Sequence, residues 1–359
     1  MLRPFTWVIL LLGSVVFTTA SAFDAFYAFG DGVCTTTSNN PAVPSLYYGH
    51  RESNGRVWIE VLAQRQGLPY DPTKNQSYFG NFSTMLLANL NHFTAPANAS
   101  NALFAVWVCD ADFVSDIQNI YPSVNVTNWN SAVQASLTNH FAVITNLYAK
   151  GVRTLILPNA VDITEVPYYN QIVSASDRGF VRGRVIYFNT NFLTTINQAK
   201  KLCPGLTVVV PDIFNLLDNV LTNAASYGLT NALYLGQPID AVEALANVAT
   251  NGPGTNYVFW DYQDPTAKFH AVIADYIQQL VSPVQVGQLI PLAGSNGVAI
   301  ANVPVGLNGV VESLTNLAAT NWAGVKSFSS TNVTQSVFVP AASAGQFYRL
   351  RFPYAWSWP

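Results

Sequence analysis

Charged residues are scarce in this sequence, and their shortage excludes several kinds of partner. Asp, Glu, Lys and Arg make up 10% of the 359 residues, whereas soluble domains average about 25%. The 16 basic residues do not outnumber the 19 acidic ones, and the net charge is −3. A protein that binds nucleic acid or an anionic membrane needs a clustered basic surface. We therefore expect no nucleic-acid partner and no polybasic membrane patch.

Cysteines and long apolar runs are rare as well. The three cysteines match no zinc-binding or CxxC spacing. The sequence also has no nucleotide-binding glycine loop and no histidine cluster, so we expect no metal and no cofactor.

One apolar run lies within residues 1–22, where Arg3 precedes Trp7–Phe17 and the triplet Ala-Ser-Ala ends at Ala22. A short charged region, an apolar stretch and small residues before a cut are typical of a signal peptide. A membrane anchor is the alternative, but a span needs about 20 apolar residues and this run is shorter. We predict cleavage after Ala22 and a secreted chain, periplasmic or extracellular, that has no transmembrane segment once mature.

The sequence does contain a large apolar fraction, 50%, and its apolar residues follow two different patterns along the chain. Between residues 23 and 282, short apolar runs predict strands at 26–29, 103–108, 154–157 and 206–210, with a short fifth at 257–260. Longer periodic stretches predict helices at 58–66, 131–147 and 189–201. This alternation is typical of a parallel sheet covered by helices, which binds ligands outside the carboxyl ends of its strands. Residues 283–359 instead alternate like short antiparallel strands, and we predict a small β-rich C-terminal module there.

Four segments, in this order, carry a resemblance to a known family. They are Phe29-Gly-Asp31, Ser53-Asn-Gly-Arg-Val-Trp-Ile-Glu60, Asn223-Ala-Ala-Ser-Tyr-Gly-Leu-Thr-Asn231, and Tyr257-Val-Phe-Trp-Asp261 followed by Pro265-Thr266. Together they resemble the SGNH (GDSL) hydrolases, a family of esterases and lipases. The resemblance implies a three-layer α/β/α sandwich with a parallel sheet over residues 23–282, and hydrolysis of carboxylic esters as the ancestral chemistry.

The positions that do chemistry in that family are changed here. The first segment should end in a nucleophilic serine, but position 32 is glycine. Ala111 stands where an oxyanion-binding asparagine belongs, and Asp264 stands where the general-base histidine belongs. Asp261 is kept, and the resemblance aligns Gly80 with the oxyanion glycine.

Elementary chemistry says what these changes cost. Gly32 has no side chain, so no acyl-enzyme can form on it. Asp264 has a reference pKa near 3.9 instead of about 6.5, so it is a poor proton shuttle near neutrality. We predict a catalytically inactive member of the fold that binds a carbohydrate, lipid or acyl-ester ligand, or a cell-envelope partner. The alternative is a secreted GDSL-type esterase or lipase with a non-standard nucleophile, for which Cys34 is the first candidate.

The resemblance also places several side chains around the former active site: Asp31, Cys34, Cys109, Asp110 and Asp112. With Asp261 and Asp264, the acids there either bind a hard cation or sugar hydroxyls, or are structural and solvated groups. Cys34 and Cys109 either form a disulfide across the pocket or remain two buried thiols. The sequence leaves both questions open.

Overall fold

The N-terminal part of the chain is built on a parallel sheet. The computed structural model describes residues 23–38, 44–318, 320–340, 346–353 and 356–358, so the predicted signal peptide lies outside the described residues. The sheet has the strand order β1-β2-β3-β4, and every neighbouring pair in it is parallel. Its strands are β1 (Phe26–Gly30), β2 (Leu103–Trp107), β3 (Thr154–Ile156) and β4 (Thr207–Val209). All five residues of β2 are buried, as expected for a central strand covered on both faces.

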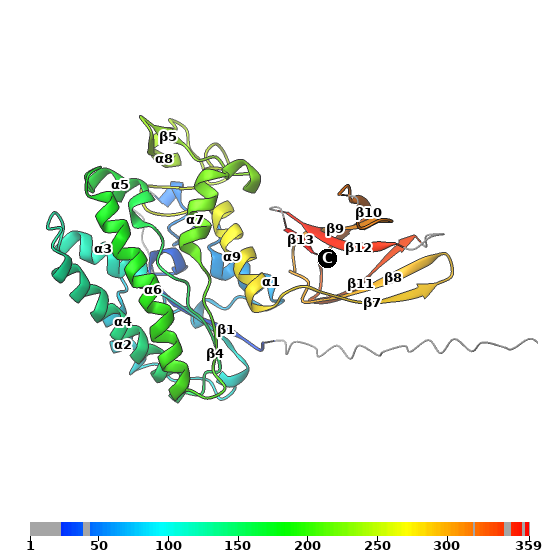
Figure 1. Cartoon of the computed structure of the whole chain (residues 1–359), viewed down its shortest axis with the longest axis horizontal. Coiled ribbons are helices and arrows are strands. Elements are labelled where there is room, and N and C mark those ends of the chain that lie inside the picture. The colour runs from blue at the N-terminus through cyan, green and yellow to red at the C-terminus, as the bar shows by residue number, and fades with distance from the viewer. Residues whose placement is uncertain (1–22, 39–43, 319, 341–345, 354–355, 359) are drawn as a thin grey trace, which may run out of the picture.

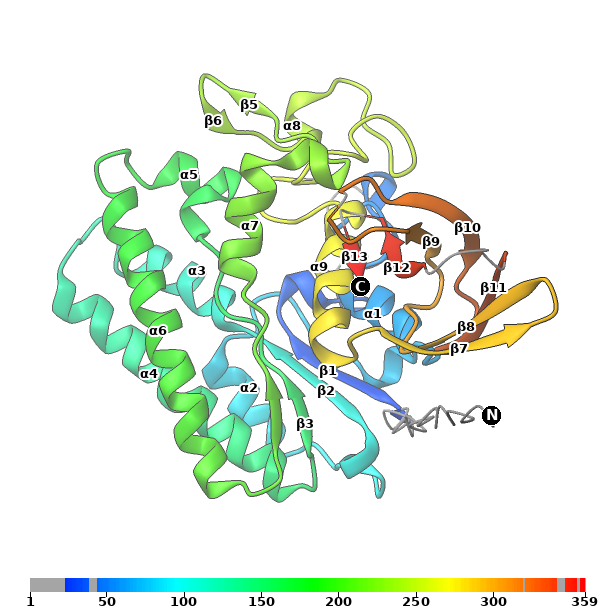
Figure 2. The ribbon, with the colours of Figure 1, turned by 45° about the vertical axis from the view of Figure 1, so that its right-hand side comes forward.

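Helices cover both faces of this sheet (Figures 1 and 2). On one side α1 (Trp58–Arg65) packs against α9 (Ala267–Val281). On the other, α4 (Val126–Ala149) packs against α2 (Ser83–Leu90) and α6 (Arg178–Leu202). The predicted three-layer α/β/α fold is thereby confirmed. The remaining elements of this part are α3 (Cys109–Asn119), α5 (Pro167–Ile172), α7 (Ile213–Thr222), α8 (Ala241–Ala244), β5 (Leu233–Tyr234) and β6 (Gln237–Pro238).

The predicted fifth strand at 257–260 is wrong. Tyr257 and Phe259 form only isolated bridges, to Thr230 and Pro265. Trp260 is fully buried and its indole N–H donates to the carbonyl of Leu46 at 2.9 Å. The run is apolar because its side chains enter the core, and a short buried run looks the same whether or not it pairs with a strand.

The C-terminal part consists of antiparallel strands, as predicted. One sheet has the order β10-β9-β12-β13 and the other β11-β8-β7. Residues of both sheets, among them Ile300 and Val311, form a second hydrophobic core separate from the first. The strands are β7 (Gln285–Leu292), β8 (Ser295–Ala301), β9 (Asn308–Leu314), β10 (Ala323–Ser329), β11 (Thr334–Pro340), β12 (Phe347–Phe352) and β13 (Trp356–Trp358).

Candidate functional site

A cavity of about 150 Å³ opens at the carboxyl ends of the parallel strands. Asp31 to Val33 follow β1, Trp107 ends β2, Val161 follows β3 and Ile213 follows β4, and all of them line the cavity. This is where a sheet of this type is expected to hold its ligands. Most of the wall is apolar, including Phe79, Phe82, Val114, Ile163, Val166, Leu217, Phe259, Phe269 and Ile273.

Glu52 fills the space that a side chain at position 32 would need. A Cβ atom placed on Gly32 would overlap Oε2 of Glu52. That oxygen is buried and has no hydrogen-bond partner among the described residues. Burial, and next the charge of Asp261, raise the pKa of Glu52 to about 8. Glu52 was not among the predicted site residues, because its only signal in the sequence is its place directly before the Ser53–Glu60 segment.

Asp264, at the position of the missing histidine, lines the same cavity. Its side chain is 6% exposed, and no described residue donates a hydrogen bond to its carboxyl oxygens. Burial raises the pKa of Asp264 well above its usual value, and the charges of Glu52 and Asp261 add to this. Burial of a carboxyl group without hydrogen-bond donors favours its protonated form.

Asp261 is kept from the family pattern, but it is fully engaged in holding its own loop. Its Oδ1 accepts hydrogen bonds from the backbone N–H groups of Gln263 and Asp264, at 2.9 and 2.8 Å. Its Oδ2 accepts from the hydroxyl of Tyr47 at 2.7 Å. Asp261 is not among the residues that line the cavity, so it supports the loop that carries Asp264.

Two more acids line the cavity, Asp31 directly after β1 and Asp110 in the first turn of α3. Asp31 is 6% exposed and its Oδ1 accepts from the N–H of Val33 at 3.3 Å. Burial, and next the charge of Asp110, raise the pKa of Asp31 well above its usual value. Asp110 accepts from the N–H of Val161 at 2.9 Å, and burial raises its pKa to about 7. Ala111 follows Asp110 in the first turn of α3 and presents only a methyl group to the cavity.

Gly80, aligned by the resemblance with the oxyanion glycine, also lines the cavity. Its φ of +74° lies in the left-handed region that favours glycine. No heavy atom lies within 4 Å of a Cβ placed there, so space is not what requires glycine at this position.

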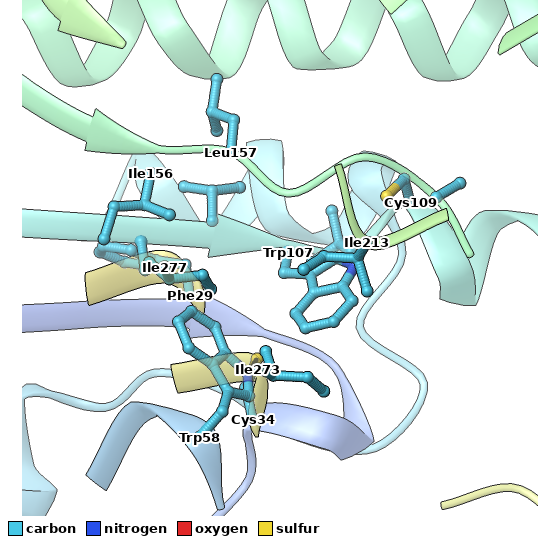
Figure 3. Packing of buried hydrophobic residues seen from close by; sticks show 14 of the residues in the cluster. Phe29, Cys34, Trp58, Trp107, Cys109, Ile156, Leu157, Ile213, Ile273 and Ile277 are labelled. Carbon is cyan, nitrogen blue, oxygen red and sulfur yellow. Dashed lines mark hydrogen bonds between the residues drawn. The ribbon is translucent and has the colours of Figure 1, made fainter. Parts of the chain in front are cut away.

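The other predicted pocket residues do not line the cavity. Cys34 and Cys109 are free thiols buried in the core, and Figure 3 shows them apart. Cys34 accepts from the indole N–H of Trp58 at 3.2 Å. The disulfide is therefore wrong, and the alternative of two buried thiols describes the pair. Asp112 accepts from the N–H of Ser83 at 2.9 Å and from the hydroxyl of Ser136, and thus joins α2 to α4.

The family segments that the sequence keeps hold the scaffold together. Ser53 donates to the carbonyl of Pro265 at 2.9 Å, and Asn54 accepts from the N–H of Ala267 at 2.8 Å. Two segments separated by about 200 residues of chain are thereby fixed beside the cavity. Glu60 forms a two-pronged ion pair with Arg51, at 2.6 and 2.9 Å. The resemblance therefore survives in residues that position the site.

Among the described residues, no group of three or more His, Cys, Asp or Glu side chains is arranged to hold a metal ion. No described helix is long and apolar enough to cross a membrane.

Comparison with known proteins agrees with the segments quoted above. A family model for GDSL-like Lipase/Acylhydrolase matches residues 26–277. A GDSL esterase/lipase of Arabidopsis thaliana is 26% identical over 219 residues, which cover 58% of this chain and 59% of that protein. The match thus spans less than two thirds of that relative's length. A second GDSL esterase/lipase of Arabidopsis thaliana is 22% identical over 337 residues, covering 75% of this chain and 86% of the relative.

Solved structures align at lower similarity. The lipase Lip_vut3 from a goat rumen metagenome has a TM-score of 0.43 and 9% identity, covering 72% of this chain and 97% of that chain. The acetylxylan esterase Axe2 of Geobacillus stearothermophilus has a TM-score of 0.42 and 11% identity, covering 72% of this chain and 94% of its own.

Proposed function

Because the chain belongs to the family of GDSL-like lipases and acylhydrolases, we propose that it is a secreted member that no longer hydrolyses esters and uses its cavity to bind a ligand. The ligand classes that fit the family are a carbohydrate, a lipid or an acyl ester, and a cell-envelope partner is the further option. The proposal includes the predicted cleavage after Ala22 and the predicted boundary between a hydrolase-like domain, residues 23–282, and a β-rich module, residues 283–359. N-terminal sequencing of secreted protein tests the first of these and should begin at Phe23.

One observation supports the loss of catalytic activity: the carboxyl group of Glu52 occupies the space that a nucleophilic side chain at position 32 would need. In triad hydrolases, removal of the nucleophile or the base alone lowers kcat by about 10⁶. Here both positions are changed, and Ala111 adds no amide to an oxyanion site. The cavity that these positions line is nevertheless present.

The alternative is a GDSL esterase or lipase with a non-standard nucleophile. Cys34, the candidate from the sequence, is 1% exposed, does not line the cavity, and has a pKa raised by burial. A reactive cysteine needs the opposite, an accessible thiol with a lowered pKa. The carboxyl group of Glu52 lies where the nucleophile of the family would be. An esterase with a non-standard nucleophile would therefore have to use Glu52.

Hydrolysis of p-nitrophenyl acetate by the full mature chain tests both readings. We expect the wild type to match the buffer rate. The revertant Gly32→Ser/Ala111→Asn/Asp264→His should carry Glu52→Ala as well, because the new Cβ at position 32 needs that space. This quadruple variant should gain at least about 10² in rate, the scale of general acid–base catalysis.

The matched control is the same variant with Gly32 retained, which should stay silent. Wild-type turnover above the buffer rate would overturn the proposal. If that turnover disappeared in Glu52→Gln, the alternative would replace it.

A further inference from the structure

The cavity carries acids that nothing in its wall balances. Four carboxyl side chains line it, and the described lining residues include no lysine, arginine or histidine. The acids are Asp31, Glu52, Asp110 and Asp264. An unpaired buried charge is costly, so such groups either keep a proton or meet a cation.

Two buried acids outside the cavity are paired with arginine. Asp275 accepts from Arg65 at 2.6 Å, and Glu312 accepts from two arginines at 2.8 and 2.6 Å. In the cavity, by contrast, Asp264 is 6% exposed and receives no side-chain hydrogen bond from the described residues. Oε2 of Glu52 is buried and unpartnered beside it. These oxygens are the acceptors that an incoming donor would find free.

The shape of the cavity selects the kind of cation. The described residues contain no group of three acids arranged to hold a metal ion, whereas an ammonium group can donate to two carboxyl side chains. The cavity of about 150 Å³ is mostly apolar, and an apolar cavity of about this size accommodates a benzene ring. The ring or short alkyl chain of an organic amine would pack against the apolar wall, while its ammonium group would donate hydrogen bonds to carboxylates.

We infer that the cavity binds a small apolar amine, with its ammonium group held by Asp264 and Glu52 and its apolar body against the phenylalanines. This ligand class goes beyond those of the proposed function, although it uses the same cavity.

Binding of a cation there is linked to proton release. At pH 7 Glu52, with a pKa of about 8, carries a proton, and Asp110, with a pKa of about 7, is half protonated. Glu52 faces the acids Asp31, Asp261 and Asp264 and the phenol of Tyr262, and Asp110 faces the acids Asp31 and Asp112. None of these supplies a positive charge, so the ammonium must displace the proton. Affinity should therefore rise by up to tenfold per pH unit between pH 6 and 8, for each proton released.

Calorimetric titration of the full chain with three probes of one size tests the inference. They are benzylamine (a cation), benzyl alcohol (neutral) and benzoate (an anion). Benzylamine should bind at least tenfold more tightly than benzyl alcohol, with benzoate weakest. Repeating the titration in buffers of different ionisation enthalpy should show protons released with benzylamine alone.

Variants locate the binding. Asp264→Asn keeps the size of the side chain and should lower benzylamine affinity at least tenfold while leaving that of benzyl alcohol unchanged. Asp24→Asn is the matched control, because Asp24 is exposed before the start of β1 and lies outside the cavity lining, and it should bind both probes like the wild type. A thermal melt of each variant confirms that it is folded.

The outcomes separate the two proposals. Benzyl alcohol binding as tightly as benzylamine overturns the amine inference and leaves a ligand-binding cavity. Absence of benzylamine binding by the folded wild type also overturns it. Ester turnover by the wild type, measured separately, overturns the proposed function whatever the amine does.

Discussion

Glu52 is an acid in an apolar setting, and its ionisation should therefore oppose folding. Burial raises its pKa to about 8, above an ordinary 4.5. A raised pKa means that the folded state binds the proton of Glu52 more tightly than the unfolded state does. The protonated carboxyl therefore stabilises the fold fully below pH 4.5, and this contribution is lost as the pH rises through 8.

Glu52→Gln should remove this loss. We expect a higher melting temperature than the wild type at pH 8.5, because each pKa unit of the shift corresponds to about 1.4 kcal/mol, and no gain at pH 4.5. Glu243→Gln on α8, an exposed glutamate outside the cavity, is the control and should change neither value. A wild type and Glu52→Gln that lose stability in parallel above pH 7 would contradict the assignment.

His270 presents the opposite case on α9. It is fully buried, neither ring nitrogen has a hydrogen-bond partner among the described residues, and burial lowers its pKa to about 3. The unfolded chain binds a proton near pH 6.5, so stability is lost as the pH falls from about 6.5 towards 3.

His270→Leu should therefore have a higher melting temperature than the wild type at pH 4.5. At pH 7 its free energy of unfolding should lie within about 1.5 kcal/mol of the wild-type value. His140→Leu provides the contrast, because Nδ1 of His140 is bonded to the carbonyl of Ser136 at 2.8 Å. That variant should lose stability at pH 7. A large loss at pH 7 in His270→Leu would show that the ring has a role that the structure does not record.

Among the elements, α2 and α4 are tied together by one carboxylate from α3. Oδ1 of Asp112 accepts from the first N–H of α2, at Ser83, and Oδ2 accepts from Ser136 on α4. An acceptor at a helix start satisfies a donor that the helix itself leaves free. The family resemblance placed Asp112 around the former active site, but its carboxylate instead binds Ser83 and Ser136.

Asp112→Ala should lower the free energy of unfolding by about 0.5–2 kcal/mol, the usual cost of a lost cap. Asp112→Asn retains one carbonyl acceptor and should lose less. Chemical denaturation measures both, and equal losses in the two variants would indicate that the hydrogen bonds contribute nothing.

Across the whole molecule, Arg65 links the α/β part to the C-terminal strands. Its Nε donates to Asp275 on α9 at 2.6 Å, and its Nη1 donates to the carbonyl of Val305 at 3.0 Å. The N–H of Val305 donates back to the carbonyl of Arg65 at 3.1 Å. The ion pair is buried, with side-chain exposures of 6% and 4%.

Removing one member of such a pair leaves an uncompensated charge. Arg65→Met should lower the free energy of unfolding by about 3–5 kcal/mol, while Arg65→Met/Asp275→Leu should recover most of the loss. Scanning calorimetry should also show the C-terminal strands melting separately in Arg65→Met. If the double variant were as unstable as the single one, the packing of Arg65 and its bond to Val305, and not the charge, would hold the parts together.

Local pattern was enough for much of this molecule. Buried runs such as Leu103–Trp107 and the periodic stretch within Val126–Ala149 have the composition that their elements require, because neighbouring residues alone create that periodicity. The four family segments identified the fold, and the glycine at position 32 identified the missing nucleophile. The run at 257–260 was mistaken for a strand because burial and pairing leave the same apolar signature.

The contents of the cavity depended on contacts between distant residues. No local pattern shows that Glu52 reaches Gly32, that Asp264 lacks a donor while Asp261 has three, or that Asp112 turns away to α2. Protonation of these acids depends on burial and on neighbouring charges, and both exist only once the chain is folded. The sequence sufficed to specify the scaffold and the lost residues, while tertiary packing set what replaced them, because electrostatics in a cavity arise from groups that folding brings together.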